Sequence, residues 1–288
     1  MHPPKVSFEF FPPKTLEASF RLWDTVQTLA PLEPRFVSVT YGAGGTTRQL
    51  TREAVETLQG HSGLNVAAHL TCVDATRSET LAIADQFAAA GVREIVALRG
   101  DPAKGSGPFQ PHPEGFADSC ALVQALAERG DFTLRVGAYP EAHPEATDDQ
   151  ADVRWLKRKF DAGADEAITQ FFFDTDSFLR FRDRCAAAGI DKPIIPGILP
   201  IENWAAARRF AVSCGTSIPA WMDTAFHNAQ RDGHCDLLAT AIATEQCSTL
   251  MEQGVKDLHF YTLNRPELTR DICHALGVTP QVALRDVA

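Results

Sequence analysis

The chain has 288 residues, of which 44% are hydrophobic and 22% are charged, and its formal net charge is −10. This composition is ordinary for a globular protein and excludes a disordered or collagen-like chain. The acidic balance argues against a broad nucleic-acid or anionic-membrane surface, because those partners attract basic patches. Small anionic ligands remain compatible with it, since they need only a few local donors.

Cysteine usage and hydropathy predict a cytoplasmic protein. The seven cysteines include no C-x-x-C pair and their number is odd, which is typical of reduced thiols rather than of a disulfide framework. The N-terminus has no basic-then-apolar leader, and no stretch approaches 18 consecutive apolar residues. We therefore expect neither a secretory signal nor a membrane span.

Short apolar or β-branched runs recur along the chain, separated by longer stretches with helical periodicity. The runs predict eight strands, at residues 6–11, 36–41, 66–73, 95–98, 134–138, 167–173, 194–199 and 258–262. The clearest helical stretches between them are residues 21–30, 52–59, 78–90 and 153–162. This alternation predicts an α/β protein with one domain, residues 1–288, folded as a closed (β/α)₈ TIM barrel. An open doubly wound sheet is the alternative.

A weak internal repeat supports the barrel. Gly91, Gly163 and Gly254 each follow an expected helix and precede an expected strand at the same offset. Glycine suits the position after a helix, where a positive φ costs least. Residues 213–236 have no clear place in this repeat, and we interpret them as an extra helix and loop.

The expected strand ends are unusually polar. Parallel strands are normally apolar on both faces, and the chemistry of a TIM barrel lies at the C-terminal ends of its strands. A functional site at this end is therefore the simplest explanation. The polar residues are Ser7, Glu9, Ser38, Thr40, His69, Thr71, Arg99, Asp101, Tyr139, Glu141 and Gln170.

Glu9 is the strongest single candidate for a catalytic residue. It lies among Phe8, Phe10 and Phe11, and aromatic burial raises the pKa of a carboxyl group. A raised pKa suits a general acid near neutral pH. The alternative is a Glu9 that pairs with a lysine or arginine across the barrel mouth.

The other candidates each have a structural alternative. Asp101 follows Gly100, which permits a close backbone approach to a ligand, but it also suits a turn cap before Pro102. His69 and His143 fit a ligand or base role, although a lone histidine is more often a hydrogen-bonded structural residue. A cationic run favours a solvated helix face with at least one side chain pointing elsewhere; it comprises Lys157, Arg158 and Lys159.

Several familiar motifs are absent from the sequence. The segment Gly42-Ala43-Gly44-Gly45-Thr46-Thr47 has Thr47 where a dinucleotide fingerprint requires its third glycine. No phosphate loop, G-x-S-x-G or H-E-x-x-H occurs. The trio His227, His234 and Cys235 fits no strong zinc template, so we expect no metal site.

Eight sequence blocks in one order resemble the methylenetetrahydrofolate reductase family, from about Val6 to Gly277. Any one block is weak evidence, whereas eight in order are highly specific. The blocks are Phe8-Glu9-Phe10-Phe11-Pro12-Pro13, Phe36-Val37-Ser38-Val39-Thr40-Tyr41-Gly42, His69-Leu70-Thr71-Cys72, Ile95-Val96-Ala97-Leu98-Arg99-Gly100-Asp101, Tyr139-Pro140-Glu141, Ile168-Thr169-Gln170-Phe171-Phe172-Phe173-Asp174, and Pro196-Gly197-Ile198-Leu199-Pro200 followed by His259-Phe260-Tyr261-Thr262-Leu263-Asn264-Arg265.

The resemblance implies a TIM barrel that holds a non-covalent FAD at the strand C-termini. NADH or NADPH would reduce the flavin, which would then reduce 5,10-methylenetetrahydrofolate to 5-methyltetrahydrofolate, a reaction of one-carbon and methionine metabolism. The two substrates would use one flavin face in turn, which gives ping-pong kinetics. The resemblance also implies a homo-oligomer, a dimer or a tetramer. The alternative function is a non-redox pterin-binding barrel enzyme, such as a methyltransferase.

The resemblance also assigns roles to matching residues. Glu9 would be the general acid that protonates N10 of the folate, and Asp101 would tune the flavin and stabilise the resulting cation. Substrate contacts would come from Gln170, Phe210 and Arg265. The residues implied to bind FAD are Thr40, His69, Arg99, Gly100, Asp101, Ala117, Tyr139, His143, Asp152 and Lys159.

The sequence departs from the family pattern in places. Phe116 replaces a common tyrosine, Trp155 replaces an asparagine that faces the cofactor in some relatives, and Ala206 replaces a polar residue. The segment 44–47 also differs in detail. Because the chain ends at Ala288, without the long extension of the eukaryotic enzymes, we expect a bacterial-type enzyme with a single catalytic domain.

Overall fold

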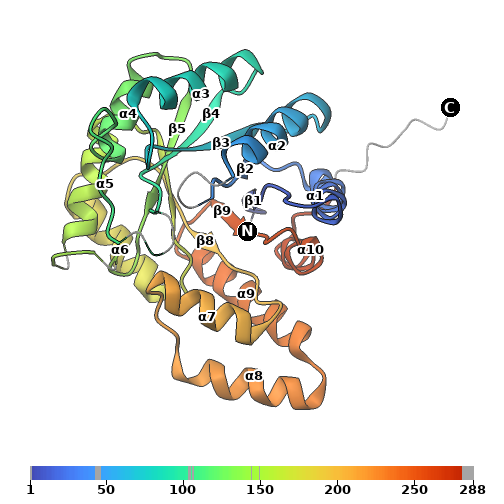
Figure 1. The fold of residues 1–288 in the computed structure, drawn as a ribbon. Helices are drawn as coiled ribbons and strands as arrows, with labels where there is room; N and C mark the ends of the chain where they lie inside the picture. Colours follow the sequence, from blue (N-terminus) through green and yellow to red (C-terminus); the bar gives the residue numbers. More distant parts are fainter. Residues whose placement is uncertain are drawn as a thin grey trace.

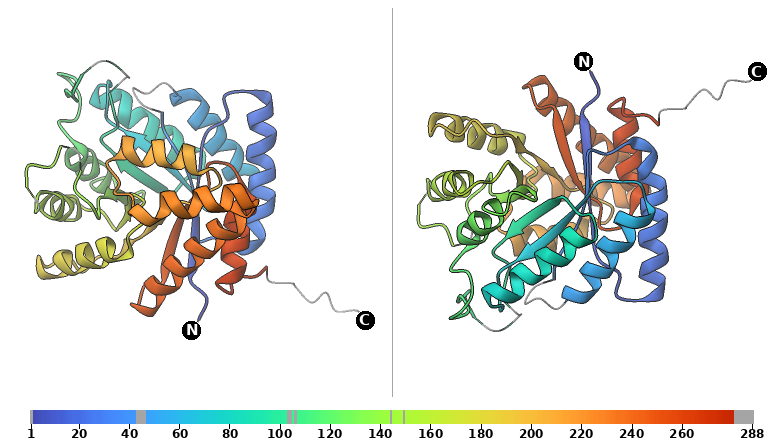
Figure 2. Two further views of the ribbon diagram at one scale, coloured as in Figure 1. Left: turned by 90° about the horizontal axis from the view of Figure 1, so that it is seen from below. Right: turned by 90° about the horizontal axis from the view of Figure 1, so that it is seen from above.

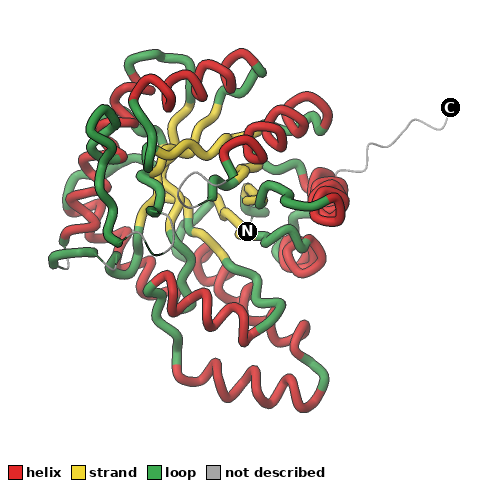
Figure 3. Tube along the Cα trace, viewed as in Figure 1, coloured by secondary structure: helices red, strands yellow, loops and turns green. Residues whose placement is uncertain are grey.

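The computed structural model describes residues 2–42, 47–102, 105, 107–143, 145–148 and 150–280. Residues 43–46 of the glycine-rich segment lie outside these ranges, so the structure does not address most of that segment. Within the described residues, a parallel sheet is surrounded by helices (Figures 1 and 3).

Every expected strand is present, although the bounds differ. The first five are β1 (Lys5–Phe10), β2 (Val37–Val39), β3 (Val66–Thr71), β4 (Glu94–Leu98) and β5 (Thr133–Ala138). The others are β6 (Glu166–Thr169), β7 (Ile194–Ile195), β8 (Gly197–Ile198) and β9 (Asp257–Tyr261). The run expected at 194–199 is split at Pro196, which has no N–H to donate to a ladder. The expected strand 167–173 ends at Thr169, and the three phenylalanines after Gln170 continue as a loop in which Phe171 and Phe172 are buried.

The sheet closes into a barrel through this split run. All pairs are parallel, in the order β7-β6-β5-β4-β3-β2-β1-β9-β8. Ile195 pairs with Ile168 of β6, and two residues later Gly197 pairs with His259 of β9. The run therefore passes from one neighbour to the other. The (β/α)₈ barrel is confirmed, and the open sheet is excluded.

Polar side chains cap the first turns of several helices. Thr15 caps the helix after β1 and Thr76 forms a capping box with Glu79, while Asp118 and Asn203 cap two later helices. The Thr15 cap explains why the first helix starts before the expected Arg21. The helices are α1 (Leu16–Leu29), η1 (Ala30–Leu32), α2 (Arg48–His61), α3 (Arg77–Ala89), α4 (Ser119–Ala127), α5 (Ala151–Asp161), α6 (Thr175–Ala187), α7 (Trp204–Cys214), α8 (Ala220–Asp232), α9 (Cys235–Glu252) and α10 (Pro266–Ala275).

The repeat glycines and the extra helix are both confirmed. Gly91, Gly163 and Gly254 have φ values of 85°, 113° and 86° after α3, α5 and α9. Most of the stretch 213–236 forms α8, which packs on α9. Helices α7, α8 and α9 lie together on one side of the molecule (Figures 1 and 2).

A charged network fills the N-terminal end of the barrel. Arg135 is 3% exposed and lies 3.7 Å above the centre of the buried Phe36 ring. Two arginines bridge three carboxylates here: Arg135 contacts Glu94 at 2.5 Å and Glu166 at 2.9 Å, and Arg35 contacts Glu166 at 2.6 Å and Asp257 at 2.9 Å. These ion pairs fill the N-terminal end of the barrel. A ligand-binding site is therefore expected at the C-terminal end of the strands.

Candidate active site

The C-terminal strand ends open into two adjoining cavities. The central cavity has a volume of about 900 Å³ and reaches Glu9. The side cavity has a volume of about 450 Å³ and reaches Lys159 on α5. Asp101 and Tyr139 line both cavities. A ligand with two parts can therefore span them.

The structure brings together nearly all of the residues expected at the site. The exception is Ala117, whose side chain is exposed and lines neither cavity. The central cavity is lined by Glu9, Thr40, His69, Asp101, Tyr139, Gln170, Phe210 and Arg265. The side cavity is lined by Arg99, Gly100, Asp101, Tyr139, His143, Asp152 and Lys159, and by the divergent Trp155.

Glu9 lies between two histidines deep in the central cavity. Its Oε2 atom is 3.3 Å from His69 Nε2 and 3.8 Å from His259 Nε2. Burial raises the pKa of Glu9, but the two imidazoles that face the carboxylate outweigh burial and hold the pKa at about 2. The expected raised pKa is therefore wrong for the ligand-free protein. The alternative partner, a lysine or arginine, is also wrong, since histidines take that place.

His259 is a residue of the site to which the sequence assigned no role of its own. It is fully buried, with its Nδ1 atom 2.8 Å from Ser7 Oγ. Its ring stacks on Phe36 at 5.6 Å and meets the edge of Tyr261 at 5.3 Å. Burial lowers the pKa of His259, so the neutral imidazole is favoured. The alternation of Asp257, His259 and Tyr261 along β9 was the signal that could have placed it inside the barrel.

Several buried polar atoms near the two cavities lack well-formed hydrogen bonds. Among the described residues, no hydrogen bond of ordinary geometry reaches Ser38 Oγ, His69 Nε2, Thr71 Oγ1 or His259 Nε2. Ser38 is the register partner of Glu9 on β2. Such orphaned groups are rare in folded proteins. Their position beside the cavities marks this end of the barrel as a candidate ligand site.

One wall of the central cavity is aromatic. Phe210 is 41% exposed and stacks on Phe171 at 5.2 Å, and Phe171 meets the edge of Tyr261 at 6.4 Å. Gln170 lies beside this wall, and its amide oxygen accepts a hydrogen bond from Phe171 N at 3.0 Å. That bond fixes the orientation of the amide and leaves its NH₂ group for a ligand. Flat rings with polar edges fit such a wall.

Lys159 provides a buried positive charge beside the side cavity. It is 6% exposed, and its Nζ atom donates to the carbonyl oxygen of Gly137 at 2.6 Å. Burial lowers its pKa to about 8. The neighbouring Lys157 and Arg158 are exposed, so Lys159 is the member of this run that points away from solvent, as expected.

The other groups of the side cavity are held by one another. Arg99 pairs with the half-exposed Glu145 at 2.6 Å, and the backbone N–H of His143 donates to Asp152 at 3.0 Å. The His143 ring meets Tyr139 edge-on at 4.6 Å. Arginine, lysine and histidine side chains around one hollow favour an anionic group such as a phosphate.

Gly100 and Asp101 form the boundary between the cavities. Gly100 has φ +83°, and a Cβ atom there would lie 2.7 Å from Val73 Cγ1, so glycine is required. Asp101 is exposed, and residues 103 and 104, whose N–H groups a turn cap would bind, lie outside the described residues, so the turn-cap alternative stays open. Burial, together with the Asp101 charge, raises the pKa of Tyr139 to about 12.

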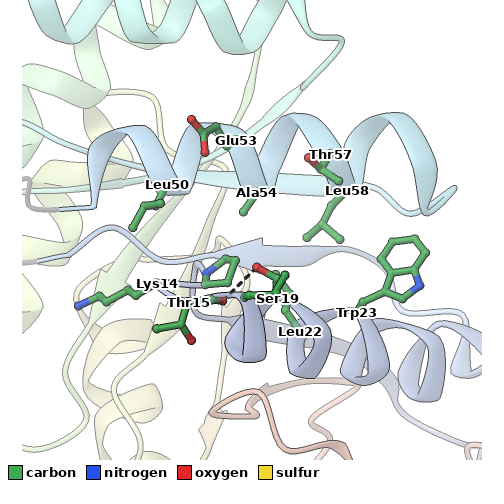
Figure 4. A pocket seen from close by; sticks show the side chains of 12 residues that line it. Lys14, Thr15, Ser19, Leu22, Trp23, Leu50, Glu53, Ala54, Thr57 and Leu58 are labelled. Atoms are coloured by element: carbon green, nitrogen blue, oxygen red, sulfur yellow. Dashed lines mark hydrogen bonds between the residues drawn. The ribbon is translucent and has the colours of Figure 1, made fainter.

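A third hollow, of about 430 Å³, lies outside the barrel between α1 and α2 (Figure 4). Its walls are mainly aliphatic, with Leu22, Leu50 and Leu58 beside Trp23. The Ser19 hydroxyl in it already donates to Thr15 O at 3.2 Å. The described lining therefore lacks the converging reactive groups that the central cavity has.

The described residues also show neither a metal-ligand cluster nor a membrane-spanning helix. Among the described residues, no three His, Cys, Asp or Glu side chains converge as metal ligands would. No helix in the described part of the chain is both long enough and apolar enough to cross a membrane.

Comparisons with known proteins agree with this geometry. The family model "Methylenetetrahydrofolate reductase" matches residues 2–277. The chain is 51% identical over 276 residues to the 5,10-methylenetetrahydrofolate reductases of Salmonella typhimurium and Escherichia coli, covering 96% of this chain and 91% of each relative. It is 37% identical to methylenetetrahydrofolate reductase (NADH) 1 of Arabidopsis thaliana, covering 94% of this chain and 48% of that one.

A solved structure shares the fold at low sequence identity. It is described as an uncharacterized protein from Clostridium thermocellum that binds two copies of 5-methyl-5,6,7,8-tetrahydrofolic acid. It superposes with a TM-score of 0.64 at 14% identity, covering 96% of this chain and 95% of that one. The family model and the bacterial relatives settle the classification: this chain belongs to the methylenetetrahydrofolate reductase family.

Proposed function

We propose that this protein reduces 5,10-methylenetetrahydrofolate to 5-methyltetrahydrofolate, with electrons from NADH or NADPH passing through a non-covalent FAD. The observation that carries the proposal is a buried carboxyl group, Glu9, facing a 900 Å³ cavity that adjoins a cationic side cavity. The names of the relatives support the folate substrate. A storage protein would need no acid at this position.

The side cavity fits the phosphate-bearing part of FAD. Lys159 is buried with a neutral carbonyl oxygen as its hydrogen-bond partner, so an anion there would compensate its charge. Arg99 and His143 would add donors, and Asp152 and Tyr139 would hold His143 in place. When bound, the flavin supplies the hydride-transfer chemistry that the side chains themselves lack.

The central cavity fits the flat ring system and the charged tail of a folate. Gln170 presents its NH₂ group to the acceptor atoms of the pterin, and Phe210 with Phe171 offers a stacking surface. Arg265, at the cavity mouth, pairs with Glu202 at 2.9 Å in the ligand-free protein. A substrate carboxylate would compete for this guanidinium.

Glu9 would deliver the proton that opens the folate ring at N10. In the ligand-free protein it is ionised, because the two histidines lower its pKa. A substrate that covers the cavity increases the burial of the carboxyl group, and burial is the factor that raises its pKa. His69 and His259 are the adjacent groups able to pass a proton to it, and Ser7 holds the His259 ring. Asp101 would stabilise the cation formed after ring opening.

The size of the central cavity supports ping-pong kinetics. A nicotinamide nucleotide and a folate would both need the space above Glu9 and beside Phe210, so they would bind in turn. Reduction of the flavin by the nucleotide requires no acid, whereas reduction of the folate does. The two half-reactions therefore depend on different residues of one site.

Absorbance spectroscopy tests this proposal. Flavin bands of the purified protein should bleach on anaerobic addition of NADH or NADPH and return on addition of methylenetetrahydrofolate. A colourless protein that gains both responses after addition of FAD also supports it. Folate binding without any flavin response would favour the non-redox pterin enzyme instead.

We also propose a cytoplasmic homo-oligomer. None of the seven cysteines, all within the described residues, forms a disulfide, which fits a reducing compartment. Helix α1 carries Leu16, Phe20 and Trp23 along one exposed stripe, with 73%, 68% and 40% of their surfaces exposed, and such stripes often mark interfaces. Light scattering of wild type and Phe20→Asp tests this: a smaller particle for the variant supports the stripe as the interface.

A further inference from the structure

The loop after β9 is fastened to the end of β1 by side chains. Thr262 Oγ1 donates to the carbonyl oxygen of Glu9 at 2.7 Å. Asn264 Oδ1 accepts from Phe11 N at 2.9 Å, and Asn264 Nδ2 donates to Phe11 O at 2.9 Å. One amide group thus makes both hydrogen bonds that a neighbouring strand would make to Phe11. We call this pair of bonds the Asn264 clamp.

The clamp continues the barrel where the backbone ladder stops. The β1–β9 register ends at Glu9 and Tyr261, and the β1–β2 register ends at Phe10 and Val39. Glu9 is thus next to last in β1, and the chain beyond Phe10 has no strand partner. The clamp and Thr262 supply the missing restraint at this point.

The backbone that carries the clamp is strained. Leu263 and Asn264 have φ values of +51° and +54°, in the left-handed region that L-residues rarely adopt. The described residues outside glycine include two others with positive φ, Glu33 and Asp74, and neither neighbours another. Strain of this kind persists where surrounding contacts fix it, and it often marks a functional site.

The strained corner shapes the central cavity. It turns Leu263 into the cavity mouth, and the clamp holds Phe11 beside it; their exposed fractions are 38% and 41%. Asn264 is 7% exposed, and both polar atoms of its side chain are used by Phe11. It is therefore placed to hold other residues rather than to bind a ligand itself.

We infer that Asn264 is a positioning residue, which fixes the end of β1 so that Glu9 faces His69 and His259 and Phe11 forms an apolar rim with Leu263. This inference rests on the proposed function, because Glu9 has an acid role only in folate reduction. The clamp matters most for proton transfer, since a displacement of about 1 Å can cost a large part of a rate. Flavin reduction by the nucleotide needs no proton from Glu9 and should not depend on the clamp.

Three substitutions separate the clamp from the strain. Asn264→Ala removes both hydrogen bonds and keeps the strained φ. Asn264→Gly removes both bonds and relieves the strain, since glycine adopts positive φ at little cost. Asn264→Asp keeps the acceptor for Phe11 N and is the conservative variant. Glu33→Gly is the matched control, because it relieves a φ of +49° at an exposed residue before β2, at the opposite end of the barrel.

Rapid-mixing absorbance measures both half-reactions in FAD-loaded protein, and thermal unfolding gives Tm. We expect Asn264→Ala and Asn264→Gly to slow flavin reoxidation by methylenetetrahydrofolate about tenfold or more, with flavin reduction at saturating NADH or NADPH changed less than about twofold. Asn264→Asp should recover part of the folate rate. Asn264→Gly should have a higher Tm than Asn264→Ala without a faster folate step, and Glu33→Gly should change neither rate.

Two results overturn the inference. Equal slowing of both half-reactions, or a folate rate that follows Tm across the variants, assigns Asn264 a structural role alone. A wild-type flavin that is reduced by the nucleotide but never reoxidised by methylenetetrahydrofolate overturns the proposed function, and this inference with it. The wild-type control therefore distinguishes the two failures.

Discussion

The two ends of the barrel bury polar groups in opposite ways. At the N-terminal end, Arg35 and Arg135 bridge Glu94, Glu166 and Asp257 by contacts of 2.5–2.9 Å. At the C-terminal end, Ser38 Oγ and Thr71 Oγ1 have no hydrogen-bond partner among the described residues, and His69 Nε2 and His259 Nε2 face only the Glu9 carboxylate there, at 3.3 and 3.8 Å. The charged groups of the first end satisfy one another, whereas the polar groups of the second are only partly satisfied within the described protein.

This difference separates stability from function within one fold. Paired buried charges are costly to break singly but need nothing from outside. Orphaned buried groups cost stability in the ligand-free protein, and they gain partners when a substrate or cofactor binds. Substitutions at the first end should therefore change unfolding, and substitutions at the second should change catalysis and binding.

The largest effect is expected for Arg135→Met. The substitution leaves Glu94 and Glu166 without their buried partner and should destabilise the protein by about 3–5 kcal/mol. Urea unfolding measures it. Arg231→Met is the control, since Arg231 is exposed and pairs with its neighbour Asp232, and it should cause no measurable change. If Arg135→Met and Arg231→Met changed the free energy of unfolding equally, the ion-pair network around Arg135 would not be a source of stability.

Glu9→Gln tests the other end. The amide cannot deliver a proton, so folate reduction should fall by about 10²–10⁴, while reduction of the flavin by NADH or NADPH continues. Single-turnover absorbance measures the two steps separately. Glu17→Gln, at an exposed carboxylate on α1, should leave both steps intact. Equal loss of both steps in Glu9→Gln would contradict the acid role.

Lys159→Met should stabilise the flavin-free protein by about 1–3 kcal/mol and weaken FAD binding about tenfold or more. Its folded-state pKa of about 8 lies below the ordinary lysine value of 10.5, so between these pH values the unfolded chain binds more protons. The stability of the flavin-free wild type should therefore rise with pH across this window, and the variant should lack that rise.

The control for Lys159 is Lys157→Met on the same helix, because Lys157 is half-exposed and pairs with Asp161 at 3.4 Å. FAD titration followed by fluorescence, together with thermal unfolding from pH 7 to 11, compares the two variants. If Lys159→Met and Lys157→Met weaken FAD binding equally, the buried charge of Lys159 does not hold the cofactor.

The smallest effect is expected for Ser38→Ala. Its hydroxyl is buried without a partner among the described residues, so its removal should leave stability unchanged or raise it by up to about 1 kcal/mol. Ser7→Ala removes the hydroxyl bound to His259 and should lower stability by about 1 kcal/mol. Chemical denaturation compares them, and equal destabilisation would show that Ser38 has a role in the ligand-free fold.

The barrel was predictable because its strands and helices follow from patterns within short sequence segments. Period-2 alternation placed Ser7 and Glu9 on one face of β1, and the glycines after the helices marked the repeat. The site followed from the convergence of parallel strand ends, which brings Glu9, Asp101 and Gln170 to one cavity although they are far apart in sequence. Ala117 precedes α4 in a loop, where no such rule fixes a position.

The ionisation of Glu9 was not predictable in the same way. Its neighbours Phe8, Phe10 and Phe11 indicated burial, which is correct, but its charge is set by His69 and His259 from other strands. Distances of 3.3 and 3.8 Å arise from register across β1, β3 and β9, and a single sequence does not specify register. Likewise, residues 194–199 were expected to form one strand, and the closed sheet shows that the parts before and after Pro196 pair with different neighbours, β6 and β9.

The split run at Pro196 makes the barrel wall uneven. Strand β9 is joined to β1 through five register pairs, whereas β8 joins it through two, at His259 and Phe260, and β7 joins β6 through two more. Local opening begins where few backbone hydrogen bonds must break together. The barrel therefore has a seam, and amide hydrogens along 194–198 should exchange with solvent before those of β1. His259 pairs with Gly197 along that seam, so local opening of the wall would also displace the histidine that faces Glu9.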